Sequence, residues 1–305
     1  MNTSLINQRL ADIQAVIPFD ILLSRQADDK LNIAKYYKAN RLAYRLINSK
    51  QGFVHMGISD DDTFHENDFL EHARIIASYI EQSKGSDVLE LAAGKAATTK
   101  YLADEYAHIN FTGLDLPNGQ LDIASSQSQN LTLLEGDYHD LSQFSSESFD
   151  VVYIIEALCH ARNKATVIQE VARILKPNGT FIIFDGYVSK PRAAMTETEA
   201  LVSDLTYTSM MVTKDGHLYA DVQRDLKASG LAITVEEDLS RNVLPSMKRL
   251  ESKAVKYFTH PRLAKMLNKI LPIEVTGNAV AAYLMPLSVD SGLHQYWMTV
   301  AIKKR

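Results

Sequence analysis

Short, almost continuous apolar runs alternate with amphipathic stretches between residues 85 and 185. Strands that are buried on both faces of a parallel sheet contain such runs, and the amphipathic stretches between them are typical of crossover helices. The alternation therefore predicts a doubly wound parallel sheet with right-handed connections. The predicted strands are 88–91, 111–114, 131–134, 151–155 and 181–184.

The pattern changes on both sides of this region. Before it, an apolar stripe with helical spacing runs from Phe69 to Ile80 and indicates a mostly helical segment. After residue 190, helical patterns are interrupted by two further runs with the character of strands. The predicted helical segments are 190–230 and 240–285, and the predicted strands are 231–236 and 294–303.

Together these elements predict an α/β fold. It is a Rossmann-like, doubly wound and mostly parallel sheet of seven strands, with an N-terminal helical cap and helical lid insertions. The predicted division is a cap over 1–84, a ligand-binding core over 85–189, and the rest of the sheet with its lids over 190–305.

Carboxylates stand near the ends of four successive predicted strands. Glu90 lies just before the small-residue turn that follows the first strand, and Asp115, Asp137 and Glu156 come at or after the ends of the next three. Because the carboxyl ends of parallel strands meet at one edge of a sheet, these side chains should gather there. Carboxylates can accept hydrogen bonds from the hydroxyl and amine groups of a nucleoside, and their negative charge favours the binding of a cationic sulfonium. The set indicates S-adenosylmethionine as the cofactor.

Each position suggests a contact with this cofactor. Small residues at Ala92 and Gly94 let the backbone approach the methionine moiety, whose carboxylate would meet the N–H groups of the following helix. The amine of the cofactor would donate to Glu90, and its ribose hydroxyls to Asp115. The adenine amine would donate to Asp137, and the ring would lie between Leu116 and Tyr138.

Two other interpretations fit this region less well. Acidic residues also collect at strand ends because those ends are solvated, although an ordered set of four is less easily explained in this way. A dinucleotide site would need glycines that cradle a pyrophosphate. The turn, Ala92-Ala93-Gly94-Lys95-Ala96, lacks the first and third glycines of Gly-x-Gly-x-Gly, which disfavours a nicotinamide-dependent oxidoreductase.

The segment 87–185 resembles the core of class I S-adenosylmethionine-dependent methyltransferases. Residues 153–161, Tyr-Ile-Ile-Glu-Ala-Leu-Cys-His-Ala, are similar to the motif after the fourth strand of sterol C-methyltransferases. Tocopherol, cyclopropane-fatty-acid and isoprenoid C-methyltransferases share parts of that motif. Residues 174–181 match the family's Leu-Lys-Pro-Gly-Gly-x-Phe element with Asn178 in place of a glycine.

The resemblance also suggests roles for individual residues. Tyr36 and Tyr37, with the His-Met-Gly at 55–57, resemble the same branches more loosely and place Tyr36 at the cofactor. In the sterol enzymes, the positions of Glu156 and His160 bind the polar end of the acceptor or remove a proton. If Glu156 opens a helical turn, the two side chains share a face.

Aromatic residues form a second group of catalytic candidates. Tyrosine faces can stabilise a cation that develops when an alkene is methylated. Tyr37 and Tyr153 are the first candidates, although most tyrosines at helical spacing are core residues with a solvated hydroxyl. His55 and His65 flank an acidic stretch, but no metal-ligand spacing is present and no metal is predicted.

The composition of the chain limits the kinds of partner and the cellular compartment that we expect. The chain has 305 residues, a formal net charge of −5 and no basic tail, which disfavours a nucleic-acid partner. The single cysteine, Cys159, fits a reducing compartment. No apolar run approaches the roughly 20 residues that span a bilayer, and no secretory signal is present, so a cytoplasmic protein without an integral membrane segment is expected. A homodimer is possible, since the segment 240–285 can serve as lid or interface.

The sequence therefore predicts an S-adenosylmethionine-dependent methyltransferase that acts on a small, largely apolar acceptor, of lipid or isoprenoid type. Carbon is slightly favoured over nitrogen or oxygen as the atom methylated. One alternative is a binding protein of the same fold without turnover. Another is a nucleic-acid methyltransferase, which is disfavoured because the chain has Ile155-Glu-Ala-Leu158 where base-methylating enzymes usually carry Asn/Asp-Pro-Pro-aromatic.

Overall fold

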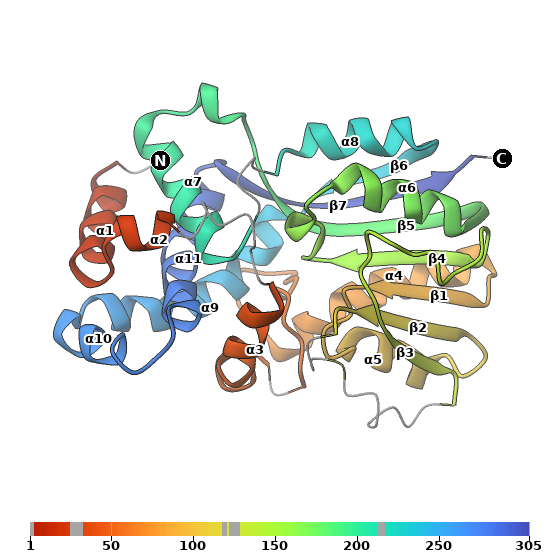
Figure 1. Cartoon of the computed structure of the whole chain (residues 1–305), viewed down its shortest axis with the longest axis horizontal. Coiled ribbons are helices and arrows are strands. Elements are labelled where there is room, and N and C mark those ends of the chain that lie inside the picture. The colour runs from red at the N-terminus through yellow and green to blue at the C-terminus, as the bar shows by residue number, and fades with distance from the viewer. Residues whose placement is uncertain are drawn as a thin grey trace.

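The computed structural model describes residues 3–24, 33–49, 51–117, 121, 129–212 and 217–304. A seven-stranded sheet in the order β3-β2-β1-β4-β5-β7-β6 forms its centre (Figure 1). Strands β1 to β5 run parallel, and β7 is antiparallel to its neighbours β5 and β6. All seven predicted strands are present: β1 Asp87–Leu91, β2 Asn110–Asp115, β3 Leu131–Glu135, β4 Phe149–Ile155, β5 Leu175–Val188, β6 Leu231–Asp238 and β7 His294–Lys303.

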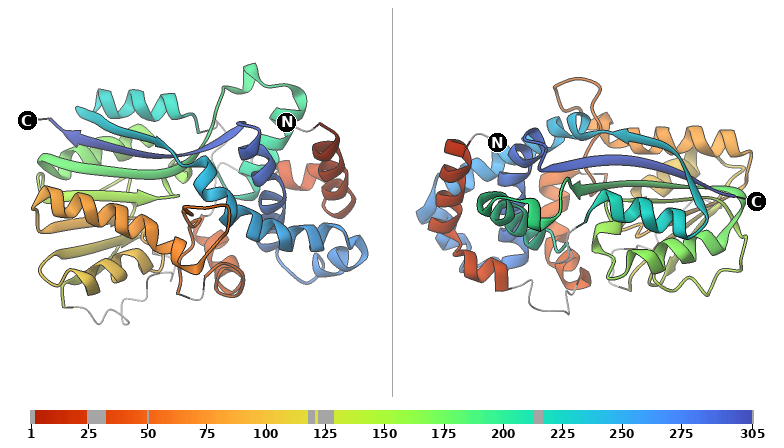
Figure 2. Two further views of the ribbon diagram at one scale, coloured as in Figure 1. Left: turned by 180° about the vertical axis from the view of Figure 1, so that it is seen from behind. Right: turned by 90° about the horizontal axis from the view of Figure 1, so that it is seen from above.

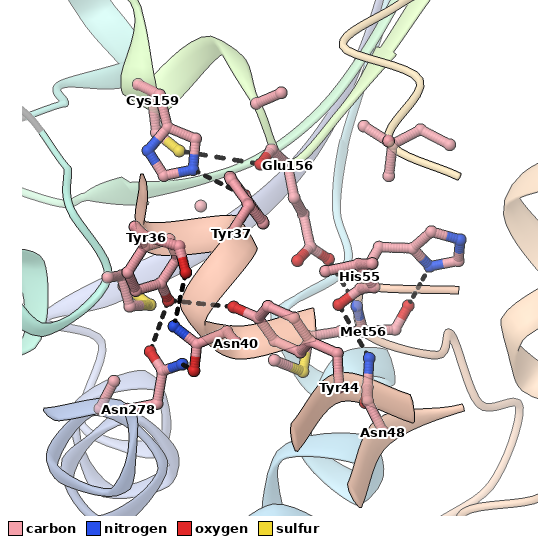
Figure 3. Close-up of a pocket in the computed structure, with 18 of the residues that line it drawn as sticks. Tyr36, Tyr37, Asn40, Tyr44, Asn48, His55, Met56, Glu156, Cys159 and Asn278 are labelled. Carbon is pink, nitrogen blue, oxygen red and sulfur yellow. Dashed lines mark hydrogen bonds between the residues drawn. The ribbon is translucent and has the colours of Figure 1, made fainter. Parts of the chain in front are cut away.

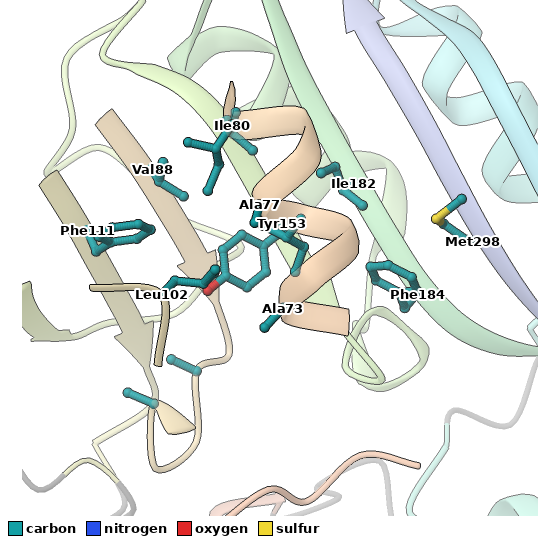
Figure 4. Packing of buried hydrophobic residues seen from close by; sticks show 14 of the residues in the cluster. Ala73, Ala77, Ile80, Val88, Leu102, Phe111, Tyr153, Ile182, Phe184 and Met298 are labelled. Atoms are coloured by element: carbon teal, nitrogen blue, oxygen red, sulfur yellow. The ribbon is translucent and has the colours of Figure 1, made fainter. Parts of the chain in front are cut away.

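Helices cover both faces of the sheet. Helices α4 (Glu71–Ser83) and α5 (Ala97–Glu105) pack on one face, whereas α6 (Lys164–Ile174) and α8 (Tyr219–Ala228) pack on the other. Because successive side chains of a strand point to opposite faces, Val151 and Tyr153 of β4 join the first cluster, and their neighbours in the strand join the second. Figure 4 shows Tyr153 beneath the apolar side of α4.

A helical assembly lies beyond the carboxyl ends of the parallel strands (Figures 1 and 2). Its apolar side chains form a third buried cluster, to which α1, α7, α9 and α11 contribute. Elements far apart in the sequence therefore close over one end of the sheet. They are α1 Thr3–Val16, α2 Phe19–Leu23, α3 Ile33–Ala43 with the π-helical turn η2 Tyr44–Asn48, α7 Glu197–Ser209, α9 Ser240–Phe258, α10 Pro261–Leu267 and α11 Ile273–Asp290.

Two expectations about the helical segments need correction. Helix α4 was expected in the cap over 1–84, but Ala73, Ile76 and Ile80 pack directly on the sheet. The apolar stripe that predicted the helix is the face that the sheet covers. The segment 240–285 contains three helices, and the last continues to Asp290. Residues 213–216 of the predicted insertion 190–230 lie outside the described residues.

Candidate functional site

A cavity of about 480 Å³ lies between the carboxyl ends of β1, β2, β4 and β5 and the helical assembly. Four carboxylates, from Glu90, Asp115, Glu156 and Asp185, line the side next to the sheet. The opposite side is lined by apolar side chains of α9 and α11 and by the turn after α10. Figure 3 shows the tyrosines of α3 and η2 between these two sides. Cavities of this size are typical of small-molecule sites.

The turn after β1 leaves room for a ligand at Gly94. Ala92, Gly94 and Ala96 all have left-handed backbone angles, with φ of 54°, 57° and 54°, before α5 begins at Ala97. Non-glycine residues adopt this conformation at a cost of about 1–3 kcal/mol, and such strain is concentrated at ligand sites. A Cβ on Gly94 would meet no protein atom within 4 Å. The backbone here is therefore accessible from the cavity.

Asp115 holds this turn in place. Its Oδ2 accepts a hydrogen bond of 2.5 Å from the backbone N–H of Gly94, which connects the end of β2 to the turn after β1. The residue is only 8% exposed, and it lines the cavity together with Leu116. The structure thus brings Ala92, Gly94 and Asp115 together as predicted.

Glu90 is a buried carboxyl with an altered protonation equilibrium. Burial raises its pKa to about 7, although hydrogen bonds from the hydroxyls of Thr99 and Tyr153 oppose that rise. The Tyr153 hydroxyl lies 3.3 Å from Glu90 Oε2. A cation at this end of the cavity would favour the ionised carboxylate.

Tyr153 is not an aromatic wall of the cavity. It is fully buried between the sheet and α4, outside the residues that line the cavity, because its position in β4 directs the ring to the α4 face. The expectation that its ring stabilises a cation on the acceptor is not supported. Its hydroxyl instead positions Glu90.

Glu156 lies on the cavity wall at the end of β4. Its Oε1 accepts hydrogen bonds from the backbone N–H of Met56, at 2.7 Å, and from the hydroxyl of Tyr296, at 3.0 Å. Burial raises the pKa of this carboxyl to about 7 against these two bonds.

The expectation that Glu156 opens a helical turn is wrong. Its φ of 49° is left-handed, and a short 3-10 helix begins only at Leu158. Glu156 and His160 therefore do not share a helical face. Both nevertheless line the cavity, because the chain turns after β4 and returns to the cavity at His160.

His160 and Tyr37 form a pair with a defined hydrogen-bond direction. The ring of His160 is buried, which lowers its pKa, so the neutral form predominates at pH 7. Nδ1 lies 3.1 Å from the carbonyl oxygen of Met211 and must carry the proton, since a carbonyl can only accept. Nε2 is then an acceptor, and the Tyr37 hydroxyl, at 3.1 Å, donates to it. The lone pairs of the Tyr37 oxygen remain available as acceptors.

Three tyrosines pack together on the wall formed by α3 and η2. The rings of Tyr36 and Tyr37 meet edge to face at 5.1 Å between centroids, and those of Tyr37 and Tyr44 lie 6.1 Å apart. The Tyr36 hydroxyl donates to Asn278 Oδ1 of α11 at 2.5 Å and lies 3.0 Å from the Tyr44 hydroxyl. Tyr36 therefore joins α3 to α11, and its contact with the cofactor stays a prediction.

Asp137 does not lie where its predicted role requires. Its Oδ1 lies 2.6 Å from Nδ1 of His139 and its Oδ2 lies 3.4 Å from Arg162, and the residue is not among those that line the cavity. The adjacent Tyr138 does line it, with its hydroxyl on the carbonyl of Ala157 at 3.2 Å. The expected bond from the adenine amine to Asp137 thus has no geometric support here.

The sequence of the chain is similar to those of known methyltransferases. Residues 89–183, which hold most of β1, all of β2 to β4 and most of β5, match the family model described as a methyltransferase domain. The chain is 26% identical over 214 residues to O-methyltransferase cnsE of Penicillium expansum, covering 67% of this chain and 74% of that protein. It is 29% identical over 172 residues to the sterol 24-C-methyltransferase erg-4 of Neurospora crassa, covering 52% of this chain and 45% of that protein.

The chain is an S-adenosylmethionine-dependent methyltransferase. The fold of this methyltransferase is shared with a solved structure of a putative sarcosine dimethylglycine methyltransferase from Galdieria sulphuraria, with a TM-score of 0.71 and 15% identity. That likeness covers 88% of this chain and 98% of the other, so it extends beyond the sheet into the helical assembly.

Two residues that line the cavity, Asp185 and Tyr296, were not predicted from the sequence. Asp185 is 2% exposed, accepts from the backbone N–H groups of Cys159 and Gly186, and lines the cavity. It directly follows the predicted strand 181–184, so the strand-end rule that selected Asp115 would also have selected it. Tyr296 of β7 carries no such local signal, because it reaches Glu156 only through pairing between β5 and β7.

Two features are absent from the part of the chain that the structure describes. No group of three or more His, Cys, Asp or Glu side chains in that part of the chain is arranged to hold a metal ion. No helix within it is long and apolar enough to cross a membrane.

Proposed function

We propose that this methyltransferase transfers the methyl group of S-adenosylmethionine to a small, largely apolar molecule, with carbon as the favoured acceptor atom. One observation supports this most directly: a single cavity has carboxylates and an accessible backbone turn at one side and an apolar chamber at the other. The two sides face each other across Glu156, His160 and Tyr37.

The cofactor would occupy the side next to the sheet. Its ribose hydroxyls would donate to Asp115, its amine to Glu90, and its methionine backbone would lie against Gly94. Leu116 and Tyr138 would flank the adenine. When bound, the sulfonium supplies the methyl group in an in-line displacement, so the protein contributes mainly by aligning the acceptor.

The acceptor would occupy the chamber formed by the helical assembly. Its walls are apolar and include Leu250, Ala254, Val275, Ala279, Ala282 and Met285. The transfer of a large apolar acceptor from water to such walls is favourable by roughly 25 cal/mol per Å² of apolar surface buried. The similarity to a sterol methyltransferase supports an acceptor of this type.

Transfer to an alkene carbon fits the groups around the centre of the cavity. The π electrons of the alkene form the new C–C bond as the S–C bond breaks, which leaves a cation on the acceptor that then loses a proton. The faces of Tyr37 and Tyr44 and the carboxylate of Glu156 would stabilise this cation. Glu156, with a pKa of about 7, would also accept the proton.

Transfer to a hydroxyl oxygen is the second candidate, and the similarity to O-methyltransferase cnsE favours it. The hydrogen bond from Tyr37 to His160 Nε2 provides a route for the proton in that case. The acceptor hydroxyl would donate to the Tyr37 oxygen, and the Tyr37 proton would pass to the imidazole.

The test combines binding and product analysis. Calorimetry with S-adenosylmethionine and S-adenosylhomocysteine measures cofactor affinity, and incubation of the enzyme with ¹³C-methyl donor and a panel of sterols, prenyl alcohols and fatty acids follows. A product whose ¹³C shift is that of a methyl on carbon supports the proposal. An O-methyl product selects the second candidate, and methylation of RNA or DNA in place of every small molecule contradicts both.

A further inference from the structure

Exposed apolar side chains are concentrated on α10 and the turn that follows it. Leu263 and Met266 are each 52% exposed, Ile270 is 73% exposed and Leu271 is 39% exposed. They are four of the eight large apolar side chains that are exposed among the described residues, and they fall within nine consecutive positions. Single exposed apolar residues are ordinary, whereas a contiguous group marks a surface that meets something.

The segment has three distinct stripes. Ala264 is buried, and Leu267 and Leu271 line the cavity, so this stripe faces the protein. The next stripe, Leu263, Met266 and Ile270, is apolar and faces outward at helical spacing. The third stripe is basic and exposed, and consists of Arg262, Lys265 and Lys269.

The same part of the chain carries a strong positive charge. Seven Lys or Arg residues and one Glu lie between 248 and 271, a net charge of +6 in a chain whose formal net charge is −5. The single acid, Glu251, is paired with Arg9 of α1. Most of the basic side chains are exposed, namely Lys248, Lys253, Lys256, Arg262, Lys265 and Lys269.

This surface adjoins the opening of the acceptor chamber. Leu271 and Ile47 are exposed, at 39% and 43%, and both also line the cavity, so they mark its mouth. Helix α10 lies in the helical assembly, at the end of the molecule opposite the C-terminus (Figures 1 and 2).

We propose that α10 and its following turn, residues 261–271, form a docking surface for an anionic lipid membrane. Its outward apolar stripe would enter the boundary between headgroups and acyl chains, and the adjacent lysines would lie at the level of anionic headgroups. The docking would place the mouth at Ile47 and Leu271 against the lipid. The binding itself does not depend on the proposed function, although an apolar acceptor drawn from the membrane would explain its position.

Two other occupants fit this surface less well. A symmetric dimer through α10 would bring the same basic patch of both copies together, since a two-fold interface uses one patch twice. A nucleic acid would pair with the lysines but would leave the stripe of Leu263, Met266 and Ile270 against charged phosphates. An anionic lipid surface complements both stripes at once.

The test is co-sedimentation of the full-length protein with vesicles, in the absence of cofactor. We expect binding to vesicles of phosphatidylcholine mixed with phosphatidylglycerol, weaker binding to phosphatidylcholine alone, and a decrease as salt is added. Replacing both Lys265→Gln and Lys269→Gln should weaken binding about 30-fold, since each removes one charge near the surface. The control pair Lys227→Gln and Lys304→Gln removes equal charge from the end of α8 and from the end of the C-terminal strand, which are joined by the bond from the Lys304 N–H to the Gly230 carbonyl, and should change nothing. The C-terminus lies at the opposite end of the molecule from α10 (Figure 1).

A second pair of variants tests the apolar stripe. Replacing both Met266→Gln and Ile270→Gln should weaken vesicle binding at least about tenfold, whereas Met266→Leu with Ile270→Leu should preserve it. Binding of S-adenosylhomocysteine by each variant, measured by calorimetry, reports an intact fold and separates loss of docking from failure of the proposed function.

Three results would overturn the proposal. The first is no sedimentation with either kind of vesicle. The second is equal weakening by the control pair at Lys227 and Lys304. The third is a dimer in sedimentation velocity that the Met266→Gln and Ile270→Gln pair dissolves, because the occupant of the stripe is then a second copy of the chain.

Discussion

The hydroxyl of Tyr296 donates a hydrogen bond of 3.0 Å to Glu156 Oε1, and it also lies 3.0 Å from Nε2 of the buried His72. Since the carboxylate only accepts, Tyr296 donates to Glu156 and accepts from the imidazole. The last strand of the sheet and α4 thereby position the carboxyl at the centre of the cavity. Tyr296 lines the cavity, and its proposed role is to position Glu156 through this hydrogen bond.

Tyr296→Phe should change the pH dependence of the enzyme. The bond from Tyr296 lowers the pKa of Glu156 against the effect of burial, so its loss raises that pKa further above about 7. Because the proposed reaction needs the ionised form of Glu156, the acidic limb of kcat/KM should move to higher pH by about one unit. Tyr219→Phe, which removes a hydroxyl bonded to Glu236 outside the cavity, is the control and should leave the limb in place. A lower kcat/KM at every pH with an unmoved limb contradicts this role.

Asp115→Asn should weaken cofactor binding, whereas Asp137→Asn should not. Asp115 holds Gly94 and lines the cavity, and Asp137 is bonded to His139 and Arg162 outside it. Loss of a charged acceptor is worth about 1.5–3 kcal/mol, or roughly a 10- to 150-fold weaker affinity for S-adenosylhomocysteine by calorimetry. Equal losses in the two variants would restore the original assignment of Asp137 to the adenine amine.

Glu90→Gln should stabilise the ligand-free protein while impairing cofactor binding. The folded-state pKa of about 7 exceeds the ordinary value of 4.5, so the folded chain retains a proton that the unfolded chain releases between these values. Stability is therefore lost as the pH rises through this window, and the loss is complete above pH 7. The variant should gain about 2–3 kcal/mol in the free energy of unfolding at pH 8, and much less at pH 5. Urea unfolding at both pH values measures this difference, and the exposed Glu105→Gln should show none.

Tyr37→Phe discriminates between the two acceptor atoms. If the acceptor is an alkene carbon, the face of the ring provides most of the stabilisation of the cation. Tyr37→Phe keeps that face, so its kcat should fall by less than about tenfold. Tyr37→Leu, which removes the ring, should lose more. If the acceptor is a hydroxyl, loss of the proton route to His160 should cost 10²- to 10⁴-fold. Single-turnover rates separate these outcomes from changes in product release.

The sheet was predictable from the sequence because each strand is a local apolar run. All seven positions agree with the structure, and β5 differs mainly in its length. That length matters, because Asp185 belongs to the strand and still reaches the cavity. Asp115 and Gly94 were predictable for the same reason, since a strand end and the turn after it are defined within a few residues.

The remaining site residues depend on contacts that no local pattern contains. The ring of Tyr153 points to the face of β4 that α4 covers. Tyr153 is therefore buried next to Glu90 and does not line the cavity. Tyr296 reaches Glu156 through the antiparallel register in which Gly186 faces Tyr296. The left-handed backbone at Glu156 likewise follows from tertiary packing, because nothing in the residue type favours it.

The antiparallel pairing of β6 and β7 brings together the two ends of the segment that supplies α9, α10 and α11. Asp238 faces Trp297 in this pairing, and the N–H of Leu239 donates to the carbonyl of Tyr296 at 2.8 Å. The helices of residues 239–293 thus leave and re-enter the sheet at neighbouring points, and β4 and β5 separate β7 from β1 and its turn at Gly94. A segment whose two ends lie close together can be replaced or lengthened with little additional loss of chain entropy on folding. In the proposed function, the part of the acceptor chamber that residues 239–293 supply could therefore diverge in sequence while the turn at Gly94, where the methyl donor would bind, keeps its fold.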